Sequence, residues 1–203
     1  MPRSEIITLV GVDGAGKSTQ ARLLAGWLRD QGVRAAYFEN PGGRPVLTRL
    51  AKRLGRADAV ALLGPRGFLI VEATVRWVML FRALLWSRLS RQVAVMDRYT
   101  YCQYAMTRAR GVAGESLVRK LYAGFPLPDR RFFLDVPPEL AQQRVTARGK
   151  DHEELSYLRA LQAAYHTLPE YADFTVVDGS GSTEAVAAEL HRLLEPERRA
   201  DAA

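Results

Sequence analysis

Four residues near the amino terminus have the types and spacing of a phosphate-binding loop: Gly11, Gly16, Lys17 and Ser18 fit the pattern G-x-x-x-x-G-K-[ST]. The apolar run 6–10 precedes them, and a helical pattern that begins at Lys17 follows, which is the context that this motif requires. Four fixed positions would match a chain of this length by chance only about once in a hundred times. The stretch GVDGAGKST therefore predicts a site for the phosphates of a nucleotide.

Each position of this loop has a chemical reason. The glycines let the backbone turn so that successive N–H groups point at a β-phosphate, at the positive end of the helix dipole. The Lys17 ammonium can follow charge between the β- and γ-phosphates, and the Ser18 hydroxyl is a ligand for Mg²⁺. A glycine turn without a ligand is the alternative, but it has no use for Lys beside Ser. We therefore expect Mg²⁺ and the phosphates of a nucleotide to be held along Gly11, Val12, Asp13, Gly14, Ala15, Gly16, Lys17, Ser18 and Thr19, a loop that ATPases, GTPases and small-molecule kinases share.

A second polar group, Asp97-Arg98-Tyr99, directly follows the apolar run 93–96. An acid at the end of a neighbouring parallel strand lies beside the loop and can hold Mg²⁺ through water. An arginine after it directs a fork of donors into the same crevice, which suits a second, mobile phosphate. A kinase with a phosphorylated acceptor gains more from Arg98 than a hydrolase does, although a structural ion pair is the alternative for Arg98. The N-K-x-D motif by which GTPases read the base is absent. Transport ATPases need a strand that ends in Asp or Asp-Glu and a separate signature loop, whereas here the strand is followed by Asp97-Arg98-Tyr99.

The elements that must position these residues alternate along the chain. Apolar and β-branched runs predict buried strands at 6–10, 35–38, 93–96, 131–136 and 174–177. Helical patterns lie at about 17–31, 46–54, 65–91, 99–110, 115–123, 138–148, 152–168 and 183–194. This alternation predicts an α/β fold with a parallel sheet covered on both faces. Without a repeat or a long linker, we expect one domain over 1–195 and a polar, frayed tail at 196–203.

The composition, with 48% hydrophobic and 25% charged residues, is that of a globular domain. The net charge of +7 is dispersed, largely as arginines along helices, which favours a polyphosphate ligand over nucleic acid. No apolar run reaches the roughly 18 residues of a membrane span. The start lacks the features of a secretory signal, so we expect a cytoplasmic protein. The single cysteine, Cys102, and three histidines predict neither an internal disulfide nor a zinc cluster; Cys102 is expected to be buried, with a reactive thiol as the alternative.

Beyond these patterns, the chain resembles the thymidylate kinases of the nucleoside monophosphate kinase group. The resemblance rests on GVDGAGKST followed by Gln20, PGG at 41–43, DRY at 97–99, LDVPPELAQQR at 134–144 and RG at 148–149. It implies a three-layer α/β/α P-loop NTPase fold with five parallel strands in the order 2-3-1-4-5 and a short helical lid at about 144–154. It also implies ATP-dependent phosphorylation of a nucleoside monophosphate, dTMP first. Another nucleotide, a nucleoside or a small alcohol as acceptor, and a non-catalytic ATP-binding switch, are the alternatives.

The resemblance assigns roles to single residues. Lys17 and Ser18 contact the donor phosphates and Mg²⁺, and Asp97 organises Mg²⁺ and its waters. On the acceptor side it implies that Asp13 faces the sugar, that Arg98 grips the phosphate next to Tyr99, and that Arg76 reads the base.

The lid is expected to supply an arginine, because Gly14 leaves the loop without one of its own. Arg144 and Arg148 are four residues apart on one predicted helix, so they share a face, and Gly149-Lys150 form a basic hinge. A lid that closes over the γ-phosphate excludes water and limits hydrolysis. We favour Arg148 as the catalytic lid arginine and assign Arg144 to ATP binding, with two solvated arginines as the alternative.

The chain departs from the family pattern in the acceptor motifs. Glu39-Asn40 precede PGG where the family has Arg-Glu, and Cys102 and Ala105-Met106-Thr107 replace Ser and Ala-Tyr-Gln. Glu72 stands where the family places an aromatic residue for base stacking, and Phe68, one turn earlier, is the candidate substitute. A buried Glu72 would require a hydrogen-bond donor on the acceptor base or a partner such as Arg76. These changes leave the ATP site intact and weaken the prediction of the acceptor.

The helix around 71–90 carries more apolar surface than one core-facing stripe needs. It is a candidate homodimer contact, and burial within a three-layer domain is the alternative.

Overall fold

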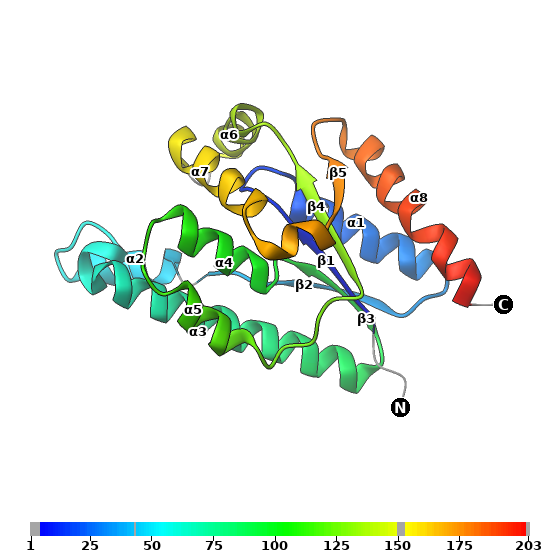
Figure 1. Ribbon diagram of the computed structural model, residues 1–203, viewed down its shortest axis with the longest axis horizontal. Helices are drawn as coiled ribbons and strands as arrows, with labels where there is room; N and C mark the ends of the chain where they lie inside the picture. The colour runs from blue at the N-terminus through cyan, green and yellow to red at the C-terminus, as the bar shows by residue number, and fades with distance from the viewer. Residues whose placement is uncertain (1–4, 43, 150–152, 202–203) are drawn as a thin grey trace.

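A computed structural model describes residues 5–42, 44–149 and 153–201 of the chain. In this part of the chain, five parallel strands form one sheet in the order β2-β3-β1-β4-β5 (Figure 1). The strands are β1 (Ile6–Val10), β2 (Ala35–Glu39), β3 (Val93–Asp97), β4 (Arg130–Asp135) and β5 (Thr175–Asp178). The predicted fold class and strand order are confirmed, and no predicted strand end differs from the observed one by more than one residue.

Helices cover both faces of the sheet, so the molecule has three layers (Figure 1). Two of them, α1 and α8, pack against each other on one face, while α3, α4 and α7 lie on the other. The helices are α1 (Lys17–Asp30), α2 (Arg44–Arg53), α3 (Ala59–Ser90), α4 (Thr100–Ala109), α5 (Glu115–Tyr122), α6 (Pro138–Ala147), α7 (Leu155–His166), the 3₁₀ helix η1 (Pro169–Asp173) and α8 (Thr183–Asp201). All five residues of β1 are buried, because the central strand has neighbours on both sides and helices on both faces.

The strand register brings the two polar motifs together. Leu9 of β1 pairs with Asp97 of β3, so both strands end at the same edge of the sheet. The phosphate-binding loop leaves β1 at this edge, and Asp97-Arg98 leave β3 beside it. Ligands of open parallel sheets bind in such a crevice at the carboxyl ends of the strands.

The three largest differences from the predicted helix ends lie in α3, α7 and α8. Helix α3 begins at Ala59, six residues before the predicted start at Pro65, because the Asp58 carboxylate caps it and accepts a hydrogen bond from the Ala61 N–H at 2.8 Å. The chain then bends at Gly64, which has a φ of +70°. Helix α7 begins at Leu155, whereas the predicted start, His152, lies outside the described residues. At the other end of the chain, α8 continues to Asp201.

No helix in the described part of the chain is both long enough and apolar enough to cross a membrane.

Candidate active site

The phosphate-binding loop is built by its backbone. Gly11, Gly14 and Gly16 have φ angles of +143°, +94° and +88°, a region that residues with a side chain rarely adopt. A Cβ on Gly14 would lie only 2.2 Å from the carbonyl oxygen of Ala141, so the loop packs directly against α6. The Lys17 ammonium, which is buried, donates a hydrogen bond to the Val12 carbonyl at 2.6 Å and so lies across the loop. This geometry fits a nest of N–H donors around a phosphate.

The metal-ligand pair predicted from the sequence lies together. The Ser18 hydroxyl donates a hydrogen bond to Oδ2 of Asp97, and the Tyr37 hydroxyl donates to the same oxygen at 3.3 Å. Oδ1 of Asp97 is buried and has no hydrogen-bond partner among the described residues. A buried carboxylate oxygen without a partner next to a hydroxyl suits a hard cation, so these residues fit Mg²⁺. Thr19, by contrast, is exposed in the first turn of α1.

Asp13 and Arg98 form an ion pair between the loop and the residue after β3. Burial alone would raise the pKa of Asp13, but Arg98 and Lys17 outweigh it and hold that pKa far below its usual value. Burial opposes the charge of Arg98 too, and Asp13 overcomes this effect and raises the pKa of the guanidinium. Arg98 also has a φ of +76°, a left-handed conformation that costs energy for an arginine and is typical of functional sites. The pair thus holds two charges at the mouth of the P-loop.

A buried carboxylate organises the wall formed by α3. Glu72 is 1% exposed, and its two oxygens face Arg76 at 3.3 Å and Arg110 at 2.5 Å. Burial would raise the pKa of Glu72, but the two guanidinium groups lower it below its ordinary value. Arg76 donates a second hydrogen bond to the Asn40 carbonyl at 2.8 Å. The partner that the sequence requires for a buried Glu72 is therefore Arg76, together with Arg110, which sequence reasoning missed.

Arg110 also covers Phe68, the residue that the sequence suggests for stacking on the acceptor base. Its guanidinium carbon lies 5.3 Å from the ring centroid of Phe68 and 5.9 Å from that of Tyr157 on α7. Phe68 is only 3% exposed, so one face of its ring is occupied by an arginine. No motif marks Arg110 in the sequence, where it is one of many helix-end arginines.

Tyr99 of the DRY segment and Cys102 on α4 are both buried. The hydroxyl of Tyr99 donates a hydrogen bond to the Pro126 carbonyl at 2.6 Å, which fixes the loop before β4 rather than facing the Asp13–Arg98 pair. Cys102 is fully buried, as expected of a small apolar residue.

The two predicted lid arginines have different surroundings. Arg144 on α6 donates hydrogen bonds to the carbonyl oxygens of Gly179, Ser180 and Gly181, at 2.8, 3.0 and 3.3 Å. A Cβ on Gly179 would lie 3.5 Å from the Ala15 carbonyl, so Arg144 fastens this loop beside the P-loop. Arg148, at the carboxyl end of α6, is exposed. Residues 150–152 of the predicted lid lie outside the described residues, as does Gly43 of the PGG motif.

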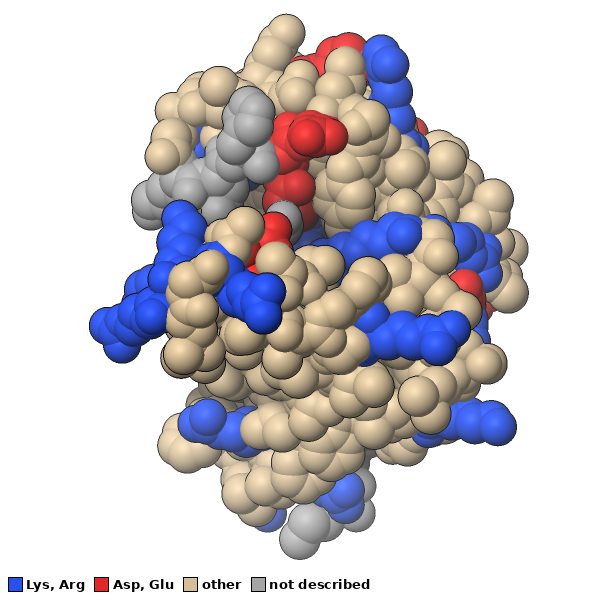
Figure 2. Space-filling view, turned by 90° about the vertical axis from the view of Figure 1, so that its left-hand side faces the viewer, with Lys and Arg blue, Asp and Glu red and all other residues tan. Residues whose placement is uncertain are grey.

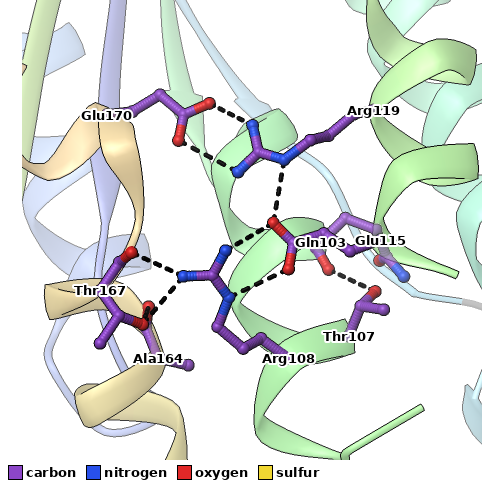
Figure 3. A network of polar contacts seen from close by, with 8 residues as sticks. All are labelled: Gln103, Thr107, Arg108, Glu115, Arg119, Ala164, Thr167 and Glu170. Atoms are coloured by element: carbon purple, nitrogen blue, oxygen red, sulfur yellow. Dashed lines mark hydrogen bonds and ion pairs between the residues drawn. The ribbon is translucent and has the colours of Figure 1, made fainter. Parts of the chain in front are cut away.

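An ion-pair network anchors α4, the helix that follows Arg98, to its neighbours (Figure 3). Glu115 on α5 pairs with Arg108 at 2.7 Å and with Arg119 at 2.9 Å. Arg119 continues to Glu170 at 2.5 Å, and Arg108 donates to the Thr167 carbonyl at 2.6 Å (Figure 3). The network joins α4 to α5 and to the segment after α7, so α4 is held in place against the sheet.

The face of the molecule shown in Figure 2 carries many Lys and Arg side chains and few Asp and Glu side chains. The surplus of basic residues gives the whole chain its charge of +7. A positive surface attracts polyanionic ligands and speeds their association.

Comparisons with known proteins show the family of the chain. The family model for thymidylate kinase matches residues 9–190. A probable thymidylate kinase of Archaeoglobus fulgidus is 32% identical over 195 residues, which cover 94% of each chain. The thymidylate kinase of Bordetella pertussis is 32% identical over 200 residues, with 93% of each chain covered, and that of Pseudomonas syringae pv. tomato is 30% identical over 197 residues, again with 93% of each.

Proposed function

The chain belongs to the thymidylate kinase family, and on this basis we propose that it transfers the γ-phosphate of ATP to the 5′-phosphate of dTMP, which yields ADP and dTDP. The chain is thus an enzyme of the nucleoside monophosphate kinase group. One observation carries the proposal: the P-loop with Lys17 and the Asp13–Arg98 pair meet at one edge of the sheet. A donor phosphate and an acceptor phosphate can therefore be held side by side.

On the donor side, the amides of the P-loop and the Lys17 ammonium bind and orient the ATP phosphates. Burial, followed by the charge of Arg98, lowers the pKa of Lys17, while Asp13 and Asp97 oppose this shift. Ser18 and Asp97 would hold Mg²⁺, which when bound neutralises charge on the β- and γ-phosphates. We assign Arg144 to the ATP site through the loop that it fastens, and Arg148 to the migrating phosphoryl group.

On the acceptor side, Arg98 binds the 5′-phosphate. A phosphate dianion competes with Asp13 for the same guanidinium, so acceptor binding frees the Asp13 carboxylate to accept a hydrogen bond from the sugar. Arg76 lies on the wall formed by α3 and donates a hydrogen bond to the Asn40 carbonyl, so we assign it to a carbonyl of the base. Phe68 contributes to this wall by packing against Arg110. Tyr99 holds the DRY turn in place through its hydrogen bond to the Pro126 carbonyl.

The test is ADP release with ATP, Mg²⁺ and a panel of acceptors: dTMP, dUMP, dCMP, dGMP, UMP and thymidine. We expect dTMP to give the largest acceleration. Acceleration by a different member alone would assign the chain to that acceptor. Tight ATP binding without acceleration by any member would contradict a kinase and support an ATP-binding switch.

We also propose that one domain spans residues 1–195 and that two copies pair through α3. Five apolar side chains between positions 78 and 89 of this helix are 42% to 73% exposed: Val78, Phe81, Leu85, Trp86 and Leu89. A helix that leaves so many large apolar groups in water gains free energy by covering them. Analytical ultracentrifugation should give twice the chain mass, and Trp86→Glu should shift the protein to one chain mass.

A further inference from the structure

The contacts of Arg110 join the acceptor wall to α7. Its guanidinium is held by the Oε2 oxygen of Glu72 at 2.5 Å, while the Oε1 oxygen of the same carboxylate faces Arg76 at 3.3 Å. The guanidinium carbon of Arg110 also lies 5.9 Å from the ring centroid of Tyr157, in the first turn of α7. Because Glu72 is 1% exposed, the loss of either arginine would leave its buried carboxylate with one charged partner fewer and with no water to take that place.

From α7 the contacts continue to the ATP site. The side-chain amide of Gln142 on α6 donates a hydrogen bond to the Glu153 carbonyl just before α7 at 3.1 Å, and Arg159 of α7 pairs with Glu139 of α6 at 2.8 Å. Helix α6 in turn touches the P-loop, because Gly14 packs against the Ala141 carbonyl. An unbroken series of contacts therefore runs from the acceptor wall to the phosphate-binding loop.

On this basis we propose that Arg110 is a positioning residue that couples the acceptor pocket to the ATP site. The inference rests on the proposed function, since it takes the wall with Arg76 as the place where the acceptor base binds. The longer of the two contacts of Glu72 is the one to Arg76. A base carbonyl that draws Arg76 away leaves Glu72 to Arg110 alone, which tightens the hold of Arg110 on α7 and, through α6, on the P-loop. Coupling of this kind is reciprocal: each ligand strengthens binding of the other by the same factor.

The experiment is a calorimetric binding cycle with a non-hydrolysable ATP analogue, measured with and without saturating dTMP. The ratio of the two Kd values is the coupling factor. For the wild-type protein we expect a factor of at least about five, the lower end for coupled sites. In Arg110→Met it should fall below about two, while the Kd of the ATP analogue alone stays within about twofold of the wild type.

Arg119→Met is the matched control. Arg119 also pairs with carboxylates and lies 4.3 Å from the ring centroid of Tyr104, but its partners are Glu115 and Glu170 rather than Glu72. It should keep the wild-type coupling factor. An unchanged factor in Arg110→Met, or an equal loss in Arg119→Met, would overturn the proposal, as would a wild-type factor of one.

Tyr157→Leu decides the matter if Arg110→Met does not fold, because it breaks only the contact with α7 and leaves Glu72 with both arginines. We expect the same loss of coupling as for Arg110→Met, and no further loss in the double variant. If the acceptor panel identifies a different acceptor, the cycle is run with that acceptor. In that case the proposed function fails while the role of Arg110 is still decided.

Discussion

The two halves of the site are built in different ways. The donor half is a short continuous stretch in which the backbone does the binding: three left-handed glycines, and a lysine that reaches back five residues to Val12. The acceptor half is assembled from side chains of α3, of α7 and of Arg110 after α4, which are joined by ion pairs around Glu72, and from a backbone carbonyl of the loop after β2. A backbone loop tolerates few substitutions and is therefore recognisable, whereas paired side chains can be exchanged together. This contrast explains how the chain keeps the ATP site of its family while its acceptor motifs differ.

The largest effect should come from the donor half. Lys17→Ala removes the only side-chain cation of the loop, and we expect kcat to fall by about a thousandfold, the scale seen when a preorganised charge is lost from a transition state. The fall should be the same with every acceptor that the enzyme uses. Lys120→Ala, at an exposed position on α5, is the control and should keep full activity. Full activity in Lys17→Ala would contradict the assignment of the P-loop.

The next effect tests whether the backbone itself builds the donor half. In Gly14→Ala the new Cβ would lie 2.2 Å from the Ala141 carbonyl, at a φ of +94°. Gly111→Ala has a similar left-handed backbone, with a φ of +61°, but its Cβ meets nothing within 4 Å. We expect a loss of about 1 kcal/mol for Gly111→Ala and about 3 kcal/mol for Gly14→Ala, because only the latter must also move α6. Urea unfolding gives both values, and equal losses would show that the loop does not depend on its contact with α6.

The same contrast separates what the sequence predicts from what it leaves open. The five strands and the P-loop follow from local patterns, since a buried strand and a glycine-rich turn are defined by neighbouring residues. The need of Glu72 for a partner also follows from its chemistry, and Arg76 lies one helical turn away. Arg110 and Tyr157 could not be found in this way, because they are 38 and 85 residues from Glu72, and only the fold brings Arg110 to Glu72 and Tyr157 to Arg110.

A third variant tests Arg98, which connects the acceptor half to Asp13 of the donor half. Arg98→Ala removes the acceptor-phosphate contact and the partner of Asp13. We expect the KM for dTMP to rise and kcat to fall together, with a loss of about a hundredfold in kcat/KM, while the KM for ATP changes little. Steady-state kinetics with each substrate varied in turn measures this. A purely structural role would leave the KM for dTMP unchanged.

The smallest effect concerns the acceptor half alone and compares two carboxylates that each hold two arginines. Glu72 is buried between Arg76 and Arg110, whereas the side chain of Glu115, between Arg108 and Arg119, is 24% exposed. We expect Glu72→Gln to cost about 2 kcal/mol of unfolding free energy at pH 7 and Glu115→Gln less than about 1 kcal/mol, since water screens an exposed pair.

The pH dependence of this difference identifies its origin. The pKa of Glu72 is lower in the folded protein than in the unfolded chain, where a glutamate titrates near 4.3, because Arg76 and Arg110 outweigh the effect of burial. The unfolded chain therefore binds more protons in acid, so the stabilisation is complete above about pH 5 and is lost as the pH falls through the folded-state pKa. Glutamine does not titrate, so the stability gap between the wild type and Glu72→Gln should narrow between pH 7 and pH 3. A gap that stays constant would show that Glu72 acts by its shape, and the arginines of the acceptor wall would then not depend on its charge.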